Sequence, residues 1–159
     1  MGSGTLMNAP DYNPAKERRR RIIIWLFVAA ALGGFVAGWK GPDWFARYRA
    51  DQIVEQFFSS LQHKDYEGAY GVWIADSGWK QHPDKYPDYT YHQFYLDWGP
   101  GGDWGLINKF KIEGSTIPED RGYKSSTQIV VQVQVNDRIA DKAQIWVNRT
   151  NKTLTEMPR

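Results

Sequence analysis

The chain has 159 residues, no cysteine and a formal net charge of +2. Without cysteine it forms no disulfide, carries no thiol nucleophile and offers no thiolate metal ligand. Five basic and two acidic residues precede residue 22, so the remainder has a net charge of −1. That remainder lacks the basic excess of a nucleic-acid-binding domain, and we expect no nucleic-acid partner.

The first 21 residues are predicted to be a disordered cytoplasmic tail. Gly, Pro, Asn and Ser dominate its first part, and no apolar period appears there. It ends in Arg18, Arg19, Arg20 and Arg21. Such a basic excess keeps its side of a membrane segment in the cytoplasm, so these arginines are the expected topology anchor.

Residues 22–39, IIIWLFVAAALGGFVAGW, contain no charge over 18 positions. A helix of that length spans roughly 27 Å, close to the hydrocarbon thickness of a bilayer. The chain has a mean hydropathy of −0.61, so the rest is too polar to enclose such a helix. We predict one transmembrane helix in the inner membrane, with residues 40–159 in the periplasm. A signal peptide cleaved near Gly38 is the alternative.

One face of the predicted membrane helix is lined by small residues. Ala30, Gly34 and Gly38 recur every four residues, and the last two form a GxxxG pattern. Small side chains let a second helix approach closely, which predicts a contact with a copy of this chain or with another membrane subunit. Alternatively, the pattern reflects the general abundance of glycine in membrane helices.

Three further helices are expected after the membrane segment. Asp43 is positioned to cap the first, over 44–62, where apolar residues recur at helical spacing. Asp65 can cap the second, over 65–76. A loop rich in turn residues follows, and a short helix over 90–98 ends at a cluster of glycines.

The apolar period then changes from 3.6 to 2, which indicates strands. A loop is expected at 114–124 and a tight turn at Asn136-Asp137. Helices followed by a meandering antiparallel sheet predict the α+β class, with the first helix lying across a curved four-stranded sheet. The predicted strands cover 106–113, 125–135, 142–148 and 153–157.

The two opening helices and the closing strands carry a resemblance to a known family. Phe57-Phe58 in the first helix and Asp65, Tyr66, Ala69 and Tyr70 in the second follow a pattern of that family, and 132–157 is similar to its closing strands. On these residues the chain resembles the nuclear-transport-factor-2-like superfamily, the cystatin-like cone. The resemblance implies a cone of helices packed on a curved sheet over residues 40–159. The family often has a strand pair where this chain has the Pro-rich stretch 76–89.

That fold does not choose a function, because the family includes isomerases, dehydratases, binding modules and assembly subunits. A tethered isomerase or dehydratase would need an acid–base set, for which this chain offers only Asp97, His92, Tyr95 and Tyr70. The histidines, His63, His82 and His92, lack the spacing of a helical or finger metal site. We expect no catalytic residues, no metal and no cofactor.

Large rings crowd residues 73–104 among glycines and prolines. Exposed Trp and Tyr are typical of interface hot spots, which predicts a protein interface. In the alternative, the same rings extend the core over the open end of the cone. The rings assigned to the interface are Trp79, Tyr86, Tyr89, Trp98 and Trp104.

The leading functional expectation is a single-pass, non-enzymatic accessory or assembly subunit of a membrane protein complex. Its topology is similar to that of the inner-membrane assembly subunits of type IV secretion systems, which have a longer outer domain. The alternatives are a small-ligand-binding domain and an isomerase- or dehydratase-like domain tethered to the membrane. Asn148 and Asn151 begin glycosylation sequons that matter only in a eukaryotic source.

Overall fold

The computed structural model describes residues 25, 43–120 and 122–156. Apart from Trp25, the predicted tail and membrane segment lie outside these residues, as do Ala30, Gly34, Gly38 and the four arginines. None of the helices in the described part of the chain combines the length and apolarity needed to cross a bilayer. From Asp43 onward the chain forms one compact unit.

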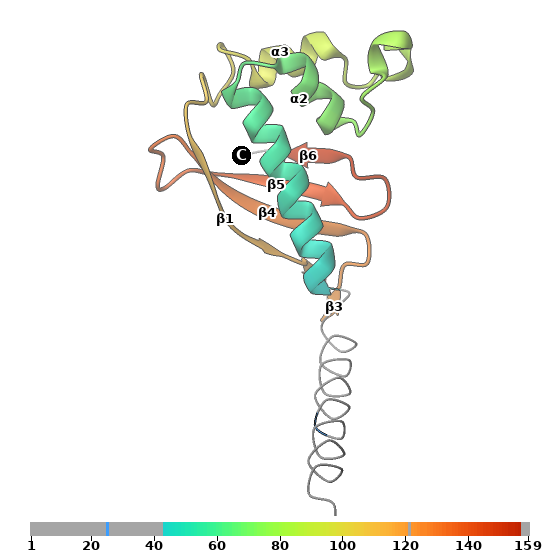
Figure 1. Cartoon of the computed structure of the whole chain (residues 1–159), viewed down its shortest axis with the longest axis vertical. Coiled ribbons are helices and arrows are strands. Elements are labelled where there is room, and N and C mark those ends of the chain that lie inside the picture. The colour runs from blue at the N-terminus through green and yellow to red at the C-terminus, as the bar shows by residue number, and fades with distance from the viewer. Residues whose placement is uncertain (1–24, 26–42, 121, 157–159) are drawn as a thin grey trace, which may run out of the picture. The chain divides into compact units, whose positions relative to one another are not determined.

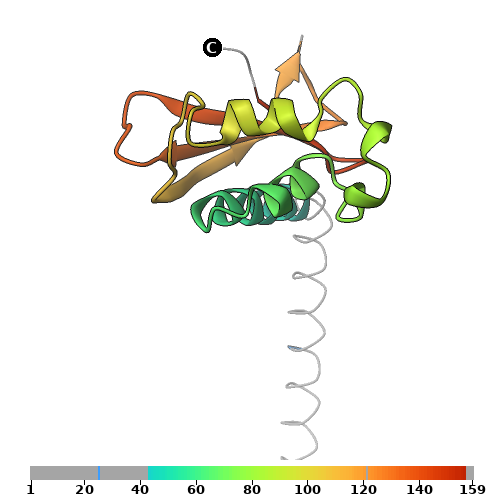
Figure 2. The ribbon, with the colours of Figure 1, turned by 90° about the horizontal axis from the view of Figure 1, so that it is seen from above.

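The α+β class is confirmed, with three helices and a four-stranded antiparallel sheet in that unit (Figure 1). The first helix covers 43–62, as its apolar period predicts, and lies across one face of the sheet (Figures 1 and 2). Its buried face carries Val54, Phe57, Phe58 and Leu61, which are at most 2% exposed. The buried face of this helix packs on the sheet and forms one side of the core.

Two shorter helices follow, and the first of them begins at the capping residue expected from the sequence, Asp65. α2 spans Tyr66–Trp73, and the side chain of its N-cap Asp65 accepts a hydrogen bond from the Gly68 amide. α3 spans Tyr91–Trp98, and its N-cap Thr90 accepts one from the Gln93 amide. These bonds satisfy amides that a helix leaves unpaired at its start.

The stretch between α2 and α3, expected to be a loop, contains two single-turn 3₁₀ helices, η1 (Trp79–Gln81) and η2 (Pro83–Lys85). The Asp76 side chain organises it. Its carboxylate accepts hydrogen bonds from the Gly78 amide, from the Tyr86 hydroxyl at 2.6 Å and from Lys85, and lies 2.7 Å from a ring nitrogen of His82.

The main sheet has the strand order β1-β4-β5-β6. Side chains of β4 alternate as predicted, because Ile129, Val131, Val133 and Val135 are at most 1% exposed and face the core. Val130 is also buried, at 8% exposure. The strands are β1 (Phe110–Thr116), β4 (Gln128–Val135), β5 (Lys142–Asn148) and β6 (Leu154–Glu156).

The prediction of a strand over 106–113 is wrong in its bounds, because β1 begins four residues later, at Phe110. The Asn136 side chain holds the segment that precedes β1. Its amide nitrogen donates to the Leu106 carbonyl at 3.0 Å, and its oxygen accepts from the Asn108 amide at 2.9 Å. These hydrogen bonds satisfy the Leu106 carbonyl and the Asn108 amide, which in a strand would pair with a neighbouring strand.

The loop expected at 114–124 also needs correction. β1 continues to Thr116 after a bulge between Ile112 and Gly114, and a small hairpin follows. This hairpin pairs β2 (Glu119–Asp120) with β3 (Tyr123–Lys124) around Gly122, whose φ of +82° suits glycine.

Aromatic rings build the part of the core beneath α2 and α3. Phe57 lies at its centre, with ring centroids at 4.9 Å from Trp98, 5.2 Å from Trp73 and 6.2 Å from Phe94. The contacts with Trp98 and Phe94 are edge-to-face, a favoured geometry for such pairs. Rings from all three helices therefore pack together next to the cavity described below.

Candidate ligand-binding cavity

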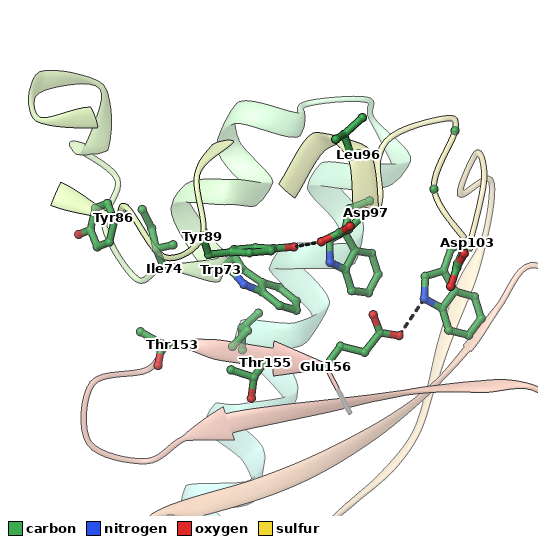
Figure 3. A pocket seen from close by; sticks show the side chains of 15 residues that line it. Trp73, Ile74, Tyr86, Tyr89, Leu96, Asp97, Asp103, Thr153, Thr155 and Glu156 are labelled. Atoms are coloured by element: carbon green, nitrogen blue, oxygen red, sulfur yellow. Dashed lines mark hydrogen bonds between the residues drawn. The ribbon is translucent and has the colours of Figure 1, made fainter. Parts of the chain in front are cut away.

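A cavity of about 830 Å³ lies between the helical layer and strand β6 (Figure 3). Its volume falls within the range of small-molecule sites. α2, α3, the loop between them, the Gly-rich turn after α3 and β6 all contribute to its wall. The lining residues on which the argument depends are Trp73, Tyr86, Tyr89, Asp97, Trp98, Gly101, Gly102, Asp103, Trp104 and Glu156.

Tyr89 and Asp97 form the central polar pair of the cavity. The Tyr89 hydroxyl donates to the Asp97 carboxylate at 2.8 Å, as Figure 3 shows. Gln93, one turn earlier on α3, donates a longer bond of 3.3 Å to the other Asp97 oxygen. The carboxylate is thus oriented by two donors while its side chain stays open to solvent.

Two contacts hold Tyr89 in this position. Its backbone carbonyl accepts a hydrogen bond of 2.7 Å from the buried Tyr70 hydroxyl on α2. Its ring centroid lies 6.0 Å from that of Trp73. The loop before α3 is therefore tied to α2, and the Tyr89 hydroxyl is directed towards Asp97.

The environment of Tyr89 keeps its hydroxyl protonated. Burial raises the pKa of Tyr89 far above its usual range, and the Asp97 carboxylate raises this pKa further as hydrogen-bond acceptor and as a nearby negative charge. The Glu156 charge acts in the same direction. Tyr89 is therefore a neutral hydrogen-bond donor at physiological pH rather than a proton acceptor.

The opposite side of the cavity joins the Gly-rich turn to the sheet. The indole nitrogen of Trp104 donates to the Glu156 carboxylate on β6 at 3.0 Å (Figure 3). The Arg138 guanidinium lies 5.2 Å from the Trp104 ring centroid, at a distance typical of a cation–π contact. Trp104 itself is 2% exposed, so this contact anchors the turn as part of the core.

Glycine is required within that turn. A Cβ atom on Gly102 would lie 1.9 Å from the Asp97 carbonyl oxygen, a distance that backbone atoms cannot accommodate without moving. A Cβ atom on Gly101 would meet nothing within 4 Å. The chain therefore passes close to the end of α3 at Gly102 only because this residue has no side chain.

The charged side chains among the described lining residues are all acidic. Asp97, Asp103 and Glu156 contribute three carboxylates, and the described lining includes no lysine, arginine or histidine. Five aromatic rings share the same wall, from Trp73, Tyr86, Tyr89, Trp98 and Trp104. A negative surface interleaved with π faces suits a positively charged organic group.

For three of the five rings assigned to a protein interface, the structure contradicts the expected exposure. Trp79, Trp98 and Trp104 are 9%, 2% and 2% exposed, so these three belong to the core, as the alternative interpretation expected. Tyr86 and Tyr89 are partly buried and pack against the same core. Four of the five rings line the cavity, and Trp79 lies outside it.

The acid–base candidates do not form one set. Asp97 lines the cavity, whereas His92 and Tyr95 are exposed on α3 and do not line it. Tyr70 is buried and uses its hydroxyl to hold Tyr89. The structure instead joins Asp97 to Tyr89 and Gln93 by hydrogen bonds.

The histidines also lie apart from the cavity, and two of them have local contacts. His63 lies 2.7 Å from the Ser59 carbonyl at the end of the first helix, and His82 belongs to the Asp76 network. Among the described residues no group of three or more potential ligands could hold a metal ion.

The sequon residues Asn148 and Asn151 accept hydrogen bonds from amides of their own turn, between β5 and β6.

Sequence reasoning missed Glu156 and the pairing of Tyr89 with Asp97. Glu156 lies on the edge strand β6, and only the sheet register brings it opposite Ile145 and towards the helices. The chain separates Trp104 and Glu156 by 52 positions, and no local pattern connects them.

Comparison with protein-family models, curated proteins and solved structures finds no match for this chain.

Proposed function

We propose that this chain is a membrane-anchored, non-enzymatic binding protein whose domain at 40–159 holds a small organic cation in the cavity. One observation carries the proposal: three carboxylates and five aromatic rings line a cavity of about 830 Å³ whose described lining has no basic side chain. The proposal develops the small-ligand alternative, because burial of Trp79, Trp98 and Trp104 removes the main argument for an exposed interface.

An amine or quaternary ammonium group matches both the carboxylates and the aromatic rings of this wall. Its charge is attracted to the π faces of Trp and Tyr, by about 0.5–2 kcal/mol per contact depending on solvation. The Asp97 and Glu156 carboxylates supply charge complementarity from opposite sides, one on α3 and one on β6. A neutral ligand of the same shape would gain the apolar contacts alone.

The polar groups of the site favour binding over proton transfer. Asp97 already accepts hydrogen bonds from Tyr89 and Gln93, and the pKa of Tyr89 is raised, so this hydroxyl remains a donor. No histidine is among the described lining residues. These features suit a fixed wall that recognises charge and shape.

The anchor and the fold family belong to the same proposal. The uncharged segment 22–39 and the basic residues before it support an inner-membrane protein with a cytoplasmic N-terminus and a periplasmic domain. The order of three helices before a four-stranded antiparallel sheet supports membership of the nuclear-transport-factor-2-like superfamily, with the cavity inside the cone.

The test is the melting temperature of the full-length protein in detergent micelles, with and without choline as the cationic probe. We expect choline to raise the melting temperature of the wild type, because a ligand that binds only the folded state stabilises it. The shift should decrease in Glu156→Gln and Asp97→Asn. Asp88→Asn, which removes an exposed carboxylate outside the cavity wall, is the matched control and should keep the shift. A shift that is absent, or equal in all four proteins, contradicts the proposal.

The accessory-subunit function remains a second candidate, supported by the small residues Ala30, Gly34 and Gly38. Gly34→Leu should weaken association with another membrane helix, because an isobutyl group separates backbones that pack closely. Phe35→Leu, one position along, is the control that leaves the small residues intact. Crosslinking in native membranes measures the effect. Equal crosslinking in both variants would end this candidate.

A further inference from the structure

The first two turns of the long helix carry an exposed aromatic cluster. Trp44, Phe45 and Tyr48 are 61%, 52% and 51% exposed, and the rings of Trp44 and Tyr48 stack with centroids 5.9 Å apart. Trp44 and Tyr48, at positions i and i+4, are neighbours on the helix surface. Phe45 lies about 100° around the helix from Trp44, so all three rings fall within the same half of its circumference. The buried face of the same helix begins at Ala50 on the opposite side. These rings therefore take no part in the core of the domain.

A positive charge accompanies the rings. The Arg49 guanidinium lies 5.5 Å from the Phe45 ring centroid, and the side chain is exposed. Trp and Tyr concentrate at membrane–water interfaces, where the ring contacts the acyl boundary and the polar tip contacts water. An arginine at the same level can pair with lipid phosphates. The chemistry of this surface therefore matches a phospholipid headgroup layer.

The length of the chain places the cluster close to a bilayer, if the segment 22–39 spans it as proposed. That segment ends at Trp39, five residues before Trp44. Five residues extend at most roughly 18 Å, and far less in a helical conformation. The headgroup region of one leaflet is itself roughly 5–8 Å deep. With that span in place, the chain length limits Trp44 to roughly 18 Å from the end of the membrane segment, which is within reach of the headgroup layer.

We infer that Trp44, Phe45, Tyr48 and Arg49 form a lipid-contacting surface that seats the domain on the headgroup layer. This inference rests on the proposed membrane anchor and is independent of the ligand proposed for the cavity. The occupant is the bilayer surface, with anionic phosphate as the partner of Arg49. The surface would restrict the orientation of the domain relative to the membrane beyond what a flexible tether allows.

The absence of native cysteine permits a direct test with single spin labels. Phe45→Cys and Tyr48→Cys are labelled in the full-length protein, reconstituted in vesicles of phosphatidylcholine and phosphatidylglycerol. Ile139→Cys, at a position 76% exposed on the turn after β4, is the control for water exposure. Ala29→Cys, within the predicted span, reports on the anchor. Collision of each label with oxygen, which partitions into lipid, is compared with collision with a water-soluble nickel chelate.

We expect the labels at 45 and 48 to show an oxygen-to-nickel collision ratio several-fold higher than that at 139, and lower than that at 29. Nickel accessibility at 45 and 48 equal to that at 139, with 29 in lipid, would overturn the lipid-contacting surface and leave the anchor standing. A water-exposed label at 29 would overturn both. Labels at 45 and 48 shielded from both reagents would indicate a protein contact and would also overturn the inference.

Discussion

At the scale of single residues, the cavity depends on a few polar contacts between segments that are distant in the chain. Tyr89 connects its loop to two helices: its carbonyl accepts from Tyr70 and its ring packs near Trp73, both on α2, and its hydroxyl donates to Asp97 on α3. Such contacts cannot be predicted from local sequence patterns. The candidate site could be predicted from the sequence only as a region rich in rings and carboxylates.

Tyr89→Phe removes one hydroxyl and keeps the ring. We expect a loss of about 1 kcal/mol in the free energy of unfolding, because the hydrogen bond to Asp97 is lost while the apolar contacts remain. Choline binding should also change, since Asp97 loses the donor that orients it. Tyr95→Phe, at an exposed position of α3, is the control, and we expect it to change the free energy of unfolding little. Denaturant unfolding of the two variants checks this, and equal stabilities would contradict the role given to the Tyr89 hydroxyl.

The Asp76 network predicts a pH dependence. The Tyr86 hydroxyl, and then His82, the Gly78 amide and Lys85, hold the pKa of Asp76 well below its usual range. A carboxyl group with a lowered pKa stabilises the fold at pH values above its unfolded pKa of about 3.9, and this stabilisation is lost as the pH falls. Between about pH 4 and pH 2 the melting temperature of the wild type should therefore fall more steeply than that of Asp76→Asn.

Asp84→Asn is the control for this pH dependence. Asp84 lies on the same loop, in η2, and forms none of the hydrogen bonds to Asp76. Its melting profile should follow that of the wild type across the acid range. If Asp76→Asn and the wild type lose stability in parallel, the network does not hold the loop between α2 and α3.

At the scale of helices and strands, the sequence predicts most of the fold. The 3.6 period of Val54, Phe57, Phe58 and Leu61 and the alternation of β4 both follow from burial against one core, so each could be predicted locally. The start of β1 could not, because it depends on the Asn136 side chain, which is remote in the chain. Exposure of the rings in 73–104 could not be predicted either, because core and interface use the same aromatic residues.

The Gly-rich turn after α3 offers a matched pair of substitutions. Gly102→Ala should destabilise the protein by about 1–3 kcal/mol, because its Cβ atom would overlap backbone at the end of α3. Gly101→Ala, on the same turn, should be nearly neutral, because its Cβ atom meets open space. The difference between their midpoints of denaturant unfolding measures the effect. Similar midpoints would mean that the turn adjusts freely and does not fix the cavity wall.

At the scale of the whole molecule, one short chain combines a proposed membrane anchor, a proposed lipid-contacting surface and a cavity with a proposed cationic ligand. The proposed anchor rests on the composition of residues 22–39 and on the arginines before them, which lie outside the described residues. The cavity depends on the packing of α2, α3 and β6, which no local pattern specifies. This contrast explains why a localisation can be proposed from the sequence more directly than a function.

The central claim is that the cavity recognises positive charge. Its most direct test is the NMR signals of the indole N–H groups of the full-length protein in micelles, titrated with choline and separately with its neutral isostere 3,3-dimethylbutanol. We predict that choline shifts the signals of Trp73, Trp98 and Trp104, with an affinity about tenfold above that of the neutral compound, since a contribution of about 1.4 kcal/mol is within the range of cation–π contacts. Trp44 and Trp146, which do not line the cavity, should be unaffected. Equal affinities for the two compounds, or shifts confined to Trp44 and Trp146, would contradict the claim.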